Sequence, residues 1–337
     1  MRQIFNFKLF ITALIISGLA LIAMRIPFVE SLFRKPLPPS EDTPSSSDIE
    51  NQARLLEEMS ARILFDSNRS GSFGIYSMKP DGSDVQTIVD TEKQEIYPDP
   101  SPDGEWVVFA RAETTARKSK SDIWIIRHNG KDSKLIAKDG TFPTFSSDGS
   151  TVYFERGRNK LISVDVSSLE QKELFPKNHP EFGRHGVIKP RVSSDGKFAA
   201  FISDKKGRWN TWYVNLETSE LSHLAEGCEP SWFAKSGKIA WIKTSNTNER
   251  SGLYKFNPKS KKVKVLQDEG PPRGHEYFPT VSPDEKFLLY SSCRVNEHSH
   301  ITANYQIFVK NLETERLTRV TFDQHNNRWP KVLPIKN

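Results

Sequence analysis

Cysteine is scarce in this chain of 337 residues, which contains only Cys228 and Cys293. Two cysteines are too few for the disulfide framework that holds small secreted domains together. They fall in neighbouring sequence repeats. The sequence is therefore compatible either with one disulfide bridge between them or with two buried free thiols. No Cys-x-x-Cys pair is present. A disulfide-rich scaffold is therefore excluded as the basis of the fold.

Motifs that carry known chemistries are also missing. The chain has no Gly-x-Ser-x-Gly elbow, so a fused serine peptidase is not supported. It has no Gly-x-x-x-x-Gly-Lys loop to cradle a phosphate. The formal net charge is only +6, and the basic clusters near residues 117–120, 205–208 and 259–264 fall in expected hairpins. Because such lysines are ordinarily solvated, we expect no nucleic-acid partner, while contact with an anionic lipid or an acidic glycan stays open.

The most informative feature that is present is a repeat. Its clearest copies are Tyr97-Pro-Asp-Pro-Ser-Pro-Asp-Gly104 and Phe142-Pro-Thr-Phe-Ser-Ser-Asp-Gly149. In Ser-x-Asp-Gly the Asp can accept backbone N–H bonds and the Gly takes a positive φ, so each copy predicts a tight hairpin. Glu285 replaces this Gly in one copy, where we expect a strained or altered turn. The repeat prolines are Pro98, Pro143, Pro190, Pro230, Pro279 and Pro330, and the apolar residues that close the next strand are Phe65, Phe109, Phe154, Phe201, Trp241 and Tyr290.

Each unit contains two more strand-like segments, for example Ile123-Trp124 and then Lys134 to Ala137. Four short strands in a period of about 40–50 residues are typical of one blade of a β-propeller. Six periods predict an all-β, six-bladed β-propeller over residues 61–337. The first unit lacks its proline strand, and the last, Arg328 to Pro334, consists of that strand alone. We therefore expect the C-terminal strand to join the N-terminal blade and close the ring; an open, solenoid-like stack is the alternative.

The segment from Asp66 to Asp84, together with the Pro-x-x-Ser-x-Asp-Gly copies, resembles the TolB-type propeller repeat of bacteria. The resemblance covers about Arg62 to Pro334. It implies the propeller fold but not one activity, because such repeats serve binding proteins, peptidase accessory domains and some polysaccharide lyases. In TolB proteins, the resemblance implies, an α/β domain precedes the propeller. The stretch that precedes Arg62 here is too short for such a domain.

The N-terminus predicts the location of the protein. Arg2 and Lys8 flank the apolar run from Leu9 to Met24, a pattern of secretory signals and signal anchors. No Ala-x-Ala-like cleavage site follows, so we expect an uncleaved anchor helix over residues 1–33; a cleaved signal and a buried core helix are the alternatives. The basic flank places the propeller outside the cytoplasm. The expected location is the bacterial inner membrane, single-pass, with the propeller in the periplasm.

Residues 34–60 are expected to link the anchor to the propeller. Lys35 to Ser47 is rich in proline and serine and lacks the apolar surface needed to fold. A short helix is predicted from Asp48 to Arg62, capped by Ser47 or Asp48. Its apolar stripe consists of Leu55, Leu56 and Met59. The stripe is expected to pack on the propeller.

One constellation could bind a ligand. His185, His275 and His325 stand four or five residues before a repeat proline, and Glu276 and Gln324 lie beside two of them. These positions lead into innermost strands, so we expect the five residues on the rim of the central channel. Imidazoles with a carboxylate or amide can bind a divalent metal, and the resemblance to propellers of oligogalacturonate lyases implies such a site. We predict instead that these residues form a polar rim that binds a partner without metal or cofactor, and we keep the metal site as the alternative.

Together these observations predict a membrane-tethered, extracytoplasmic propeller that binds proteins or peptides, or acts as a scaffold, in the cell envelope. Its ligand is expected to insert at the channel mouth, with a glycan as the next candidate. The alternative function is a metal-assisted lyase or hydrolase acting on acidic polysaccharide. The missing catalytic motifs favour a protein that is not an enzyme.

Overall fold

Strands dominate the described part of the chain. The computed structural model describes residues 43–116, 119–207, 209–244, 250–268, 273–297 and 299–335. These residues form 24 strands, the helix α3 and a short 3₁₀ turn, η2 (Pro180–Phe182). The all-β prediction is confirmed. The predicted anchor and most of the predicted linker lie outside the described residues, and within those residues no helix has the length and apolar character needed to cross a membrane.

The strands fall into antiparallel groups of four that follow one another along the chain. Three groups are β4 (Gln94–Pro100), β5 (Trp106–Ala112), β6 (Ser121–Arg127) and β7 (Lys134–Ala137); β8 (Thr141–Phe145), β9 (Thr151–Arg156), β10 (Lys160–Asp165) and β11 (Gln171–Phe175); β12 (Ile188–Val192), β13 (Phe198–Ser203), β14 (Asn210–Asn215) and β15 (Leu221–Glu226). Two more are β16 (Cys228–Trp232), β17 (Ile239–Thr244), β18 (Ser251–Phe256) and β19 (Val263–Gln267), and β20 (Arg273–Val281), β21 (Phe287–Arg294), β22 (Gln306–Asn311) and β23 (Leu317–Arg319). One parallel pair, Ser251 with His275, joins these last two groups.

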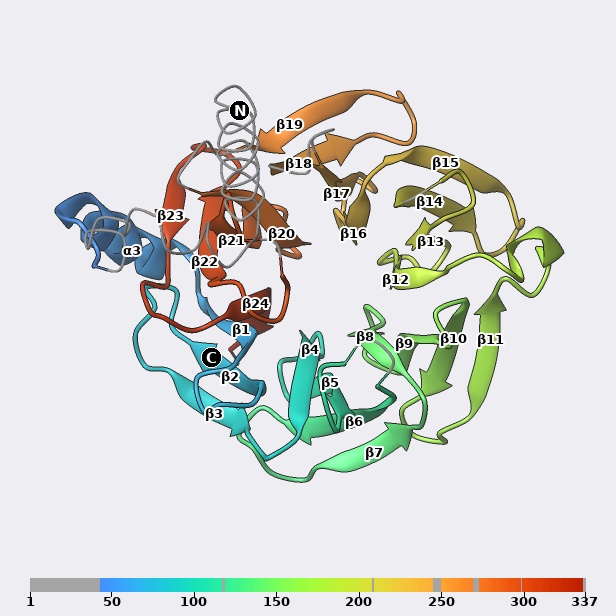
Figure 1. Ribbon diagram of the computed structural model, residues 1–337, viewed down its shortest axis with the longest axis horizontal. Helices are drawn as coiled ribbons and strands as arrows, with labels where there is room; N and C mark the ends of the chain where they lie inside the picture. The colour runs from blue at the N-terminus through green and yellow to red at the C-terminus, as the bar shows by residue number, and fades with distance from the viewer. Residues whose placement is uncertain are drawn as a thin grey trace, which may run out of the picture. The chain divides into compact units, whose positions relative to one another are not determined.

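The two ends of the described chain share the remaining sheet. β24 (Asn327–Pro334) pairs antiparallel with β1 (Ala61–Ser67), which continues to β2 (Gly74–Met78) and β3 (Gln86–Val89). In Figure 1 the groups stand around a central axis, with β4, β8, β12, β16, β20 and β24 nearest to it. Sheets arranged radially in this way are characteristic of a β-propeller.

Every innermost strand carries the same β-bulge. In β4, Tyr97 and Pro98 together lie opposite Phe109, and the pairing resumes at Asp99. The same shift occurs opposite each of the other closing aromatic residues, including Phe65 on β1. A bulge of this kind bends the strand and re-aims a side chain. The repeat proline therefore lies in the bulge, and the closing aromatic residue lies opposite it on the next strand.

The turn at Glu285 keeps the geometry of the other copies. Its N–H donates to the Ser282 carbonyl at 2.9 Å, and its φ is +64°, in the region that usually favours glycine. The expectation of a strained or altered turn is confirmed as strain, because a glutamate here adopts the left-handed conformation while the turn keeps its shape. Its Oε1 accepts the N–H groups of Lys235 and Ser236, both at 2.6 Å. These bonds to the neighbouring group offset part of the backbone strain.

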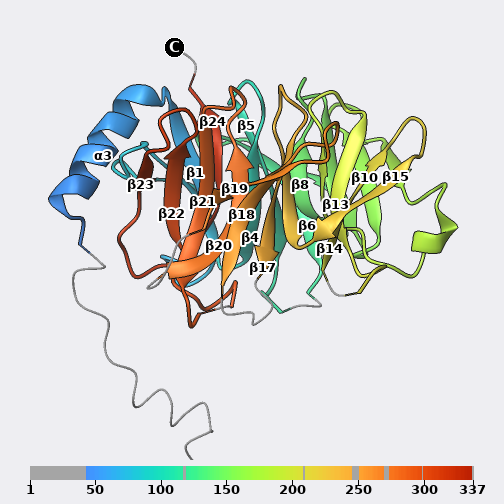
Figure 2. The same ribbon diagram turned by 90° about the horizontal axis from the view of Figure 1, so that it is seen from above.

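The helix α3 (Ser46–Glu58) packs on the outermost strand β23, as Figure 2 shows. Ser45 caps it, so the helix begins two residues earlier than expected, and it ends earlier because the chain must extend into β1. Leu55 is buried against the sheet. The Gln52 side-chain amide donates to the Arg319 carbonyl at 3.2 Å. The helix therefore covers the outer edge of this group.

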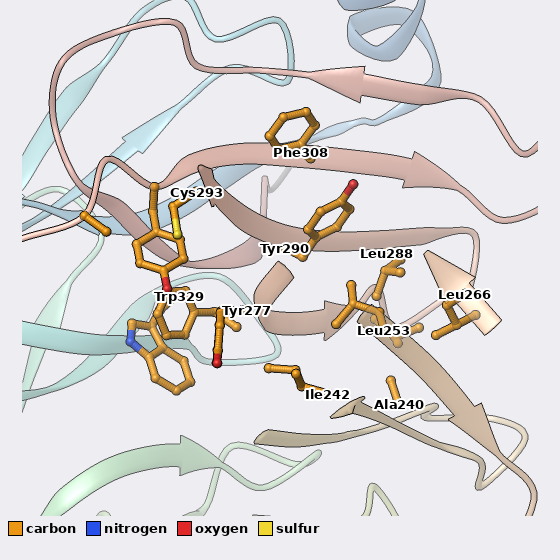
Figure 3. Packing of buried hydrophobic residues seen from close by; sticks show 14 of the residues in the cluster. Ala240, Ile242, Leu253, Leu266, Tyr277, Leu288, Tyr290, Cys293, Phe308 and Trp329 are labelled. Carbon is orange, nitrogen blue, oxygen red and sulfur yellow. The ribbon is translucent and has the colours of Figure 1, made fainter. Parts of the chain in front are cut away.

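Apolar side chains fill the spaces between neighbouring groups. Figure 3 shows one such cluster, which runs from Ile242 on β17 through Leu253 and Tyr290 to Trp329 on β24. Both cysteines are free thiols, and Cys293 is fully buried among these residues. Burial raises the pKa of the Cys293 thiol to about 12, so this thiol stays protonated at neutral pH.

Candidate functional site

Six side chains meet at the centre of the propeller, one from each innermost strand. They belong to the residues directly before the repeat prolines, and we call them the central cluster: Tyr97, Phe142, Lys189, Glu229, Phe278 and Trp329. Each has a φ between +50° and +61°. Such a conformation costs a non-glycine residue of the order of 1–3 kcal/mol, and it persists only where the surroundings over-determine it.

Aromatic rings make up most of the central cluster. Tyr97 and Phe142 are stacked, with ring centroids 4.0 Å apart. Trp329 meets Tyr97 edge-on at 5.2 Å and lies 4.6 Å from Phe278. Each such pair contributes about 0.5–1.5 kcal/mol beyond the burial of its area. Since Phe278, Trp329 and Phe142 are at most 7 % exposed, these rings fill the channel at this level.

A buried ion pair completes the central cluster. The Lys189 ammonium contacts Glu229 Oε1, and the two side chains are only 15 % and 2 % exposed. The ammonium also lies 4.9 Å from the centroid of the Trp329 ring and 5.3 Å from that of Phe142. A cation over aromatic faces is attracted by their negative quadrupole. The Lys189 ammonium therefore occupies the position between these aromatic rings where the cation of a ligand could otherwise bind.

Buried carboxylates hold three of the strained backbones in place. A bulge takes the N–H of its first residue out of the strand ladder, and a buried N–H without a partner is costly. In three strands a carboxylate from a neighbouring group of strands accepts this N–H. The pairs are Tyr97 to Asp66 at 3.1 Å, Lys189 to Glu155 at 2.8 Å and Phe278 to Glu229 at 2.8 Å.

Burial changes the ionisation of two of these carboxylates. It raises the pKa of Asp66, although Arg328, whose Nε donates to Asp66 Oδ1 at 2.8 Å, pulls in the opposite direction. Burial also raises the pKa of Glu155 from 4.5 to about 7, against the lowering effect of the Lys189 N–H bond and of nearby cations. Glu155 is therefore a group that titrates near neutral pH.

Glu155 is expected to make stability depend on pH. The pKa of Glu155 is higher in the folded protein than in the unfolded chain, so the folded protein holds an extra proton between pH 4.5 and about 7. The free energy of unfolding should therefore fall as the pH rises through this window, and the whole decrease should amount to at most about 3 kcal/mol. Glu155→Gln retains an oxygen for the Lys189 N–H and cannot ionise, so urea unfolding at pH 5 to 8 should show a flatter dependence. Exposed Glu170→Gln should keep the wild-type slope; equal slopes for all three proteins would contradict this role.

A second layer of side chains, which is charged, lies two residues after the central cluster along the innermost strands. The residues directly after three of the prolines are Asp99, Arg191 and Lys331. Lys331 Nζ is 3.3 Å from Asp99 Oδ1, and Arg191 Nη1 donates to the Phe142 carbonyl at 3.3 Å. Burial lowers the pKa of both cations, with Asp99 opposing the shift. The channel centre is thus occupied by an aromatic layer and, next to it, a charged layer.

The structure separates the five residues predicted for the rim. His275 and Glu276 are 1 % and 0 % exposed. They lie inside β20, because this strand extends its pairing into the stretch where a loop was expected. The Nε2–H of His275 donates to the Val295 carbonyl at 2.8 Å. Gln324 and His325 lie in the turn between β23 and β24, where Gln324 is exposed.

His185 belongs to a different part of the propeller, between η2 and β12. It places Nδ1 3.2 Å from Asp204 Oδ1. Among the described residues, no three or more His, Cys, Asp or Glu side chains are grouped so that they could hold a metal ion. The histidines predicted for the rim stand four or five residues before a repeat proline. The central cluster occupies the position directly before that proline, and the aromatic and charged residues there were the signal that could have revealed it.

Comparisons with known proteins agree with this architecture. No protein-family model matches the chain. A TolB homologue of Chlorobium chlorochromatii is 27% identical over 146 residues, which are 42% of this chain and 31% of that protein. The match thus spans about a third of the relative's length.

Solved structures with the same fold include two TolB proteins. TolB from Acinetobacter baumannii superposes with a TM-score of 0.65 at 16% identity, over 82% of this chain and 67% of that one. A putative TolB from Agrobacterium tumefaciens gives 0.57 at 13% identity, over 82% of this chain and 99% of that one. The repeat, the six bulges and these likenesses agree: the chain has a β-propeller that is similar to the propellers of TolB proteins.

Proposed function

We propose that the six groups of strands are the blades of a closed six-bladed ring, in which the pairing of β24 with β1 completes the first blade. The antiparallel register from Ala61 with Pro334 to Ser67 with Asn327 supports this closure. The apolar run in residues 1–33 tethers the ring to the inner membrane, and within residues 34–60 the proline- and serine-rich stretch before α3 links the two. The propeller then lies on the periplasmic side.

We further propose that the propeller is a protein- or peptide-binding module, or scaffold, of the cell envelope. The observation that carries this proposal is the central cluster. Its rings and ion pair fill the channel, so a partner cannot thread through and is recognised at a mouth. Tyr97 and Lys189 remain partly exposed and can contact a ligand that enters. His185, Gln324 and His325 are the rim residues that remain accessible to such a partner.

The metal-assisted lyase or hydrolase is the weaker alternative. It needs several metal ligands at one place, whereas His275 is buried in a strand and His185 contacts Asp204. No contact among the described residues favours that chemistry over binding. The protein is therefore proposed to act without a cofactor.

Site-specific photocrosslinking tests the binding function. A photoreactive residue is placed at Gln324 or His325, and at exposed Lys172 on β11 as a matched control, in cells that produce the full chain. We expect light-dependent adducts with an envelope protein from the two rim positions and not from the control, and the adducts should stay with membranes after a carbonate wash. Adducts of equal yield from Lys172, or none from the rim, would refute recognition at this mouth.

A further inference from the structure

The positive charge of the chain is concentrated in one group of strands. Between Cys228 and Gln267 the sequence has eight lysines and one arginine but only two acids, Glu229 and Glu249. This segment, which contains β16 to β19, therefore carries a formal charge of +7. Since the whole chain carries +6, the rest of the chain has a formal charge of −1. A local field of this kind attracts acidic partners and raises their association rate.

The outermost strand of this group is exposed along its edge. Among the described residues, β19 pairs with β18 alone, and Figure 1 shows it at the periphery. The edge of β23 differs, because α3 covers it and Gln52 bonds to its carbonyls. An uncovered edge presents N–H and C=O groups that can pair with another strand. β19 therefore offers a place where a strand of another chain can be added.

The side chains of β19 are unusual for an exposed edge. Val263 and Val265 are 52% and 59% exposed. Being two residues apart, they point to the same face of the sheet, where the cross-strand partner of Val265 is half-buried Tyr254. Lys262 and Lys264 alternate with the valines and are exposed as well. We call Lys261 to Val265 the β19 edge.

Further lysines lie beside the β19 edge. Its own Lys261 places Nζ 2.8 Å from the Tyr213 hydroxyl of the neighbouring group, and Lys243 Nζ is 5.9 Å from the centroid of the Tyr254 ring. On the other side, burial lowers the pKa of Lys255, with the charges of Lys238 and Lys264 adding to the shift and those of Glu315 and Glu285 opposing it. The apolar strip is thus bordered by cations on both sides.

We propose that the β19 edge binds an extended acidic segment of a partner protein, which adds to the sheet as a further strand. Backbone pairing supplies affinity, apolar side chains at every second position cover Val263 and Val265, and acidic ones between them meet the lysines. The same lysines repel a second copy of this edge, so self-pairing is disfavoured. An anionic lipid surface could use the charges but not the backbone edge or the alternating pattern. This surface is separate from the channel mouth.

A designed peptide tests this proposal. The probe is a short, end-capped, fluorescent peptide in which Glu alternates with Val, and its Kd for the propeller is measured by anisotropy at low and moderate salt. A matched peptide is methylated at alternate backbone nitrogens, which removes strand pairing and leaves the charge. A third peptide has Lys in place of Glu. We expect the first peptide to bind, and the other two to bind at least about tenfold more weakly.

Surface variants then locate the site. The double variant Lys262→Glu and Lys264→Glu should weaken the binding of the Glu-Val peptide by at least about tenfold. The control Lys131→Glu and Lys134→Glu makes the same charge change on the β4–β7 group, where both lysines are exposed, and should leave binding nearly unchanged. Equal binding of the methylated peptide, equal loss in both variants, or binding only to phosphatidylglycerol vesicles would overturn the proposal.

Discussion

Deleting residues 328–337 is expected to destabilise the propeller by several kcal/mol, enough to unfold much of the population at physiological temperature. The deletion removes nearly all of β24, and with it the inner neighbour of β1. It also removes Arg328, the partner of fully buried Asp66, and breaking a buried ion pair costs about 3–5 kcal/mol. Trp329 is lost from the central cluster as well.

Urea and thermal unfolding measure this effect. A shorter deletion of residues 335–337, which leaves β24 intact, is the matched control and should unfold like the wild type. If the long deletion cannot be purified, Trp329→Leu provides a milder test: it keeps β24 and should cost about 1–3 kcal/mol. A long deletion that melts at the wild-type temperature would show that β24 does not close the ring.

Replacing Glu229 with Gln is expected to cost about 3–5 kcal/mol, because Lys189 is left charged and buried without its partner. Gln can still accept the Phe278 N–H, so the backbone bond is retained and the loss reports the charge. The free energy of unfolding from urea titration is the measurement.

The exposed pair of Lys93 and Glu113 provides a matched control. Its nitrogen and oxygen are 2.6 Å apart, but the side chains are 48% and 74% exposed. Glu113→Gln should change stability by no more than about 1 kcal/mol, because water screens such pairs. If Glu229→Gln is as stable as Glu113→Gln, the Lys189–Glu229 pair does not support the central cluster.

Local patterns predicted the strands well. Lys134 to Ala137 was expected as an outer strand and forms β7 with those bounds. The Ser-x-Asp-Gly turns were predictable because an Asp accepts nearby N–H groups, as Asp103 Oδ1 does from the Glu105 N–H at 3.1 Å. These interactions span a few residues, so the sequence alone contains the information.

Predictions about the candidate site were less successful where they relied on a loop. His275 was placed on an exposed rim from its distance to Pro279, yet β20 extends through it and buries it. Whether a strand continues depends on pairing with its neighbour, here β21, and that pairing is not visible in a segment read alone. The helix α3 shows the same limit, since its end is set by the start of β1.

The repeat, the short strands and the turns could be predicted from the sequence, because they depend on contacts between residues close along the chain. The role of the residue before each proline depends instead on contacts between distant segments. A bulge turns each of these side chains inward, and the radial arrangement of the sheets then brings together residues from six distant segments, so that Trp329 packs against Tyr97 and Lys189 pairs with Glu229. The composition of the channel centre follows from this geometry. No property of one repeat could have specified it.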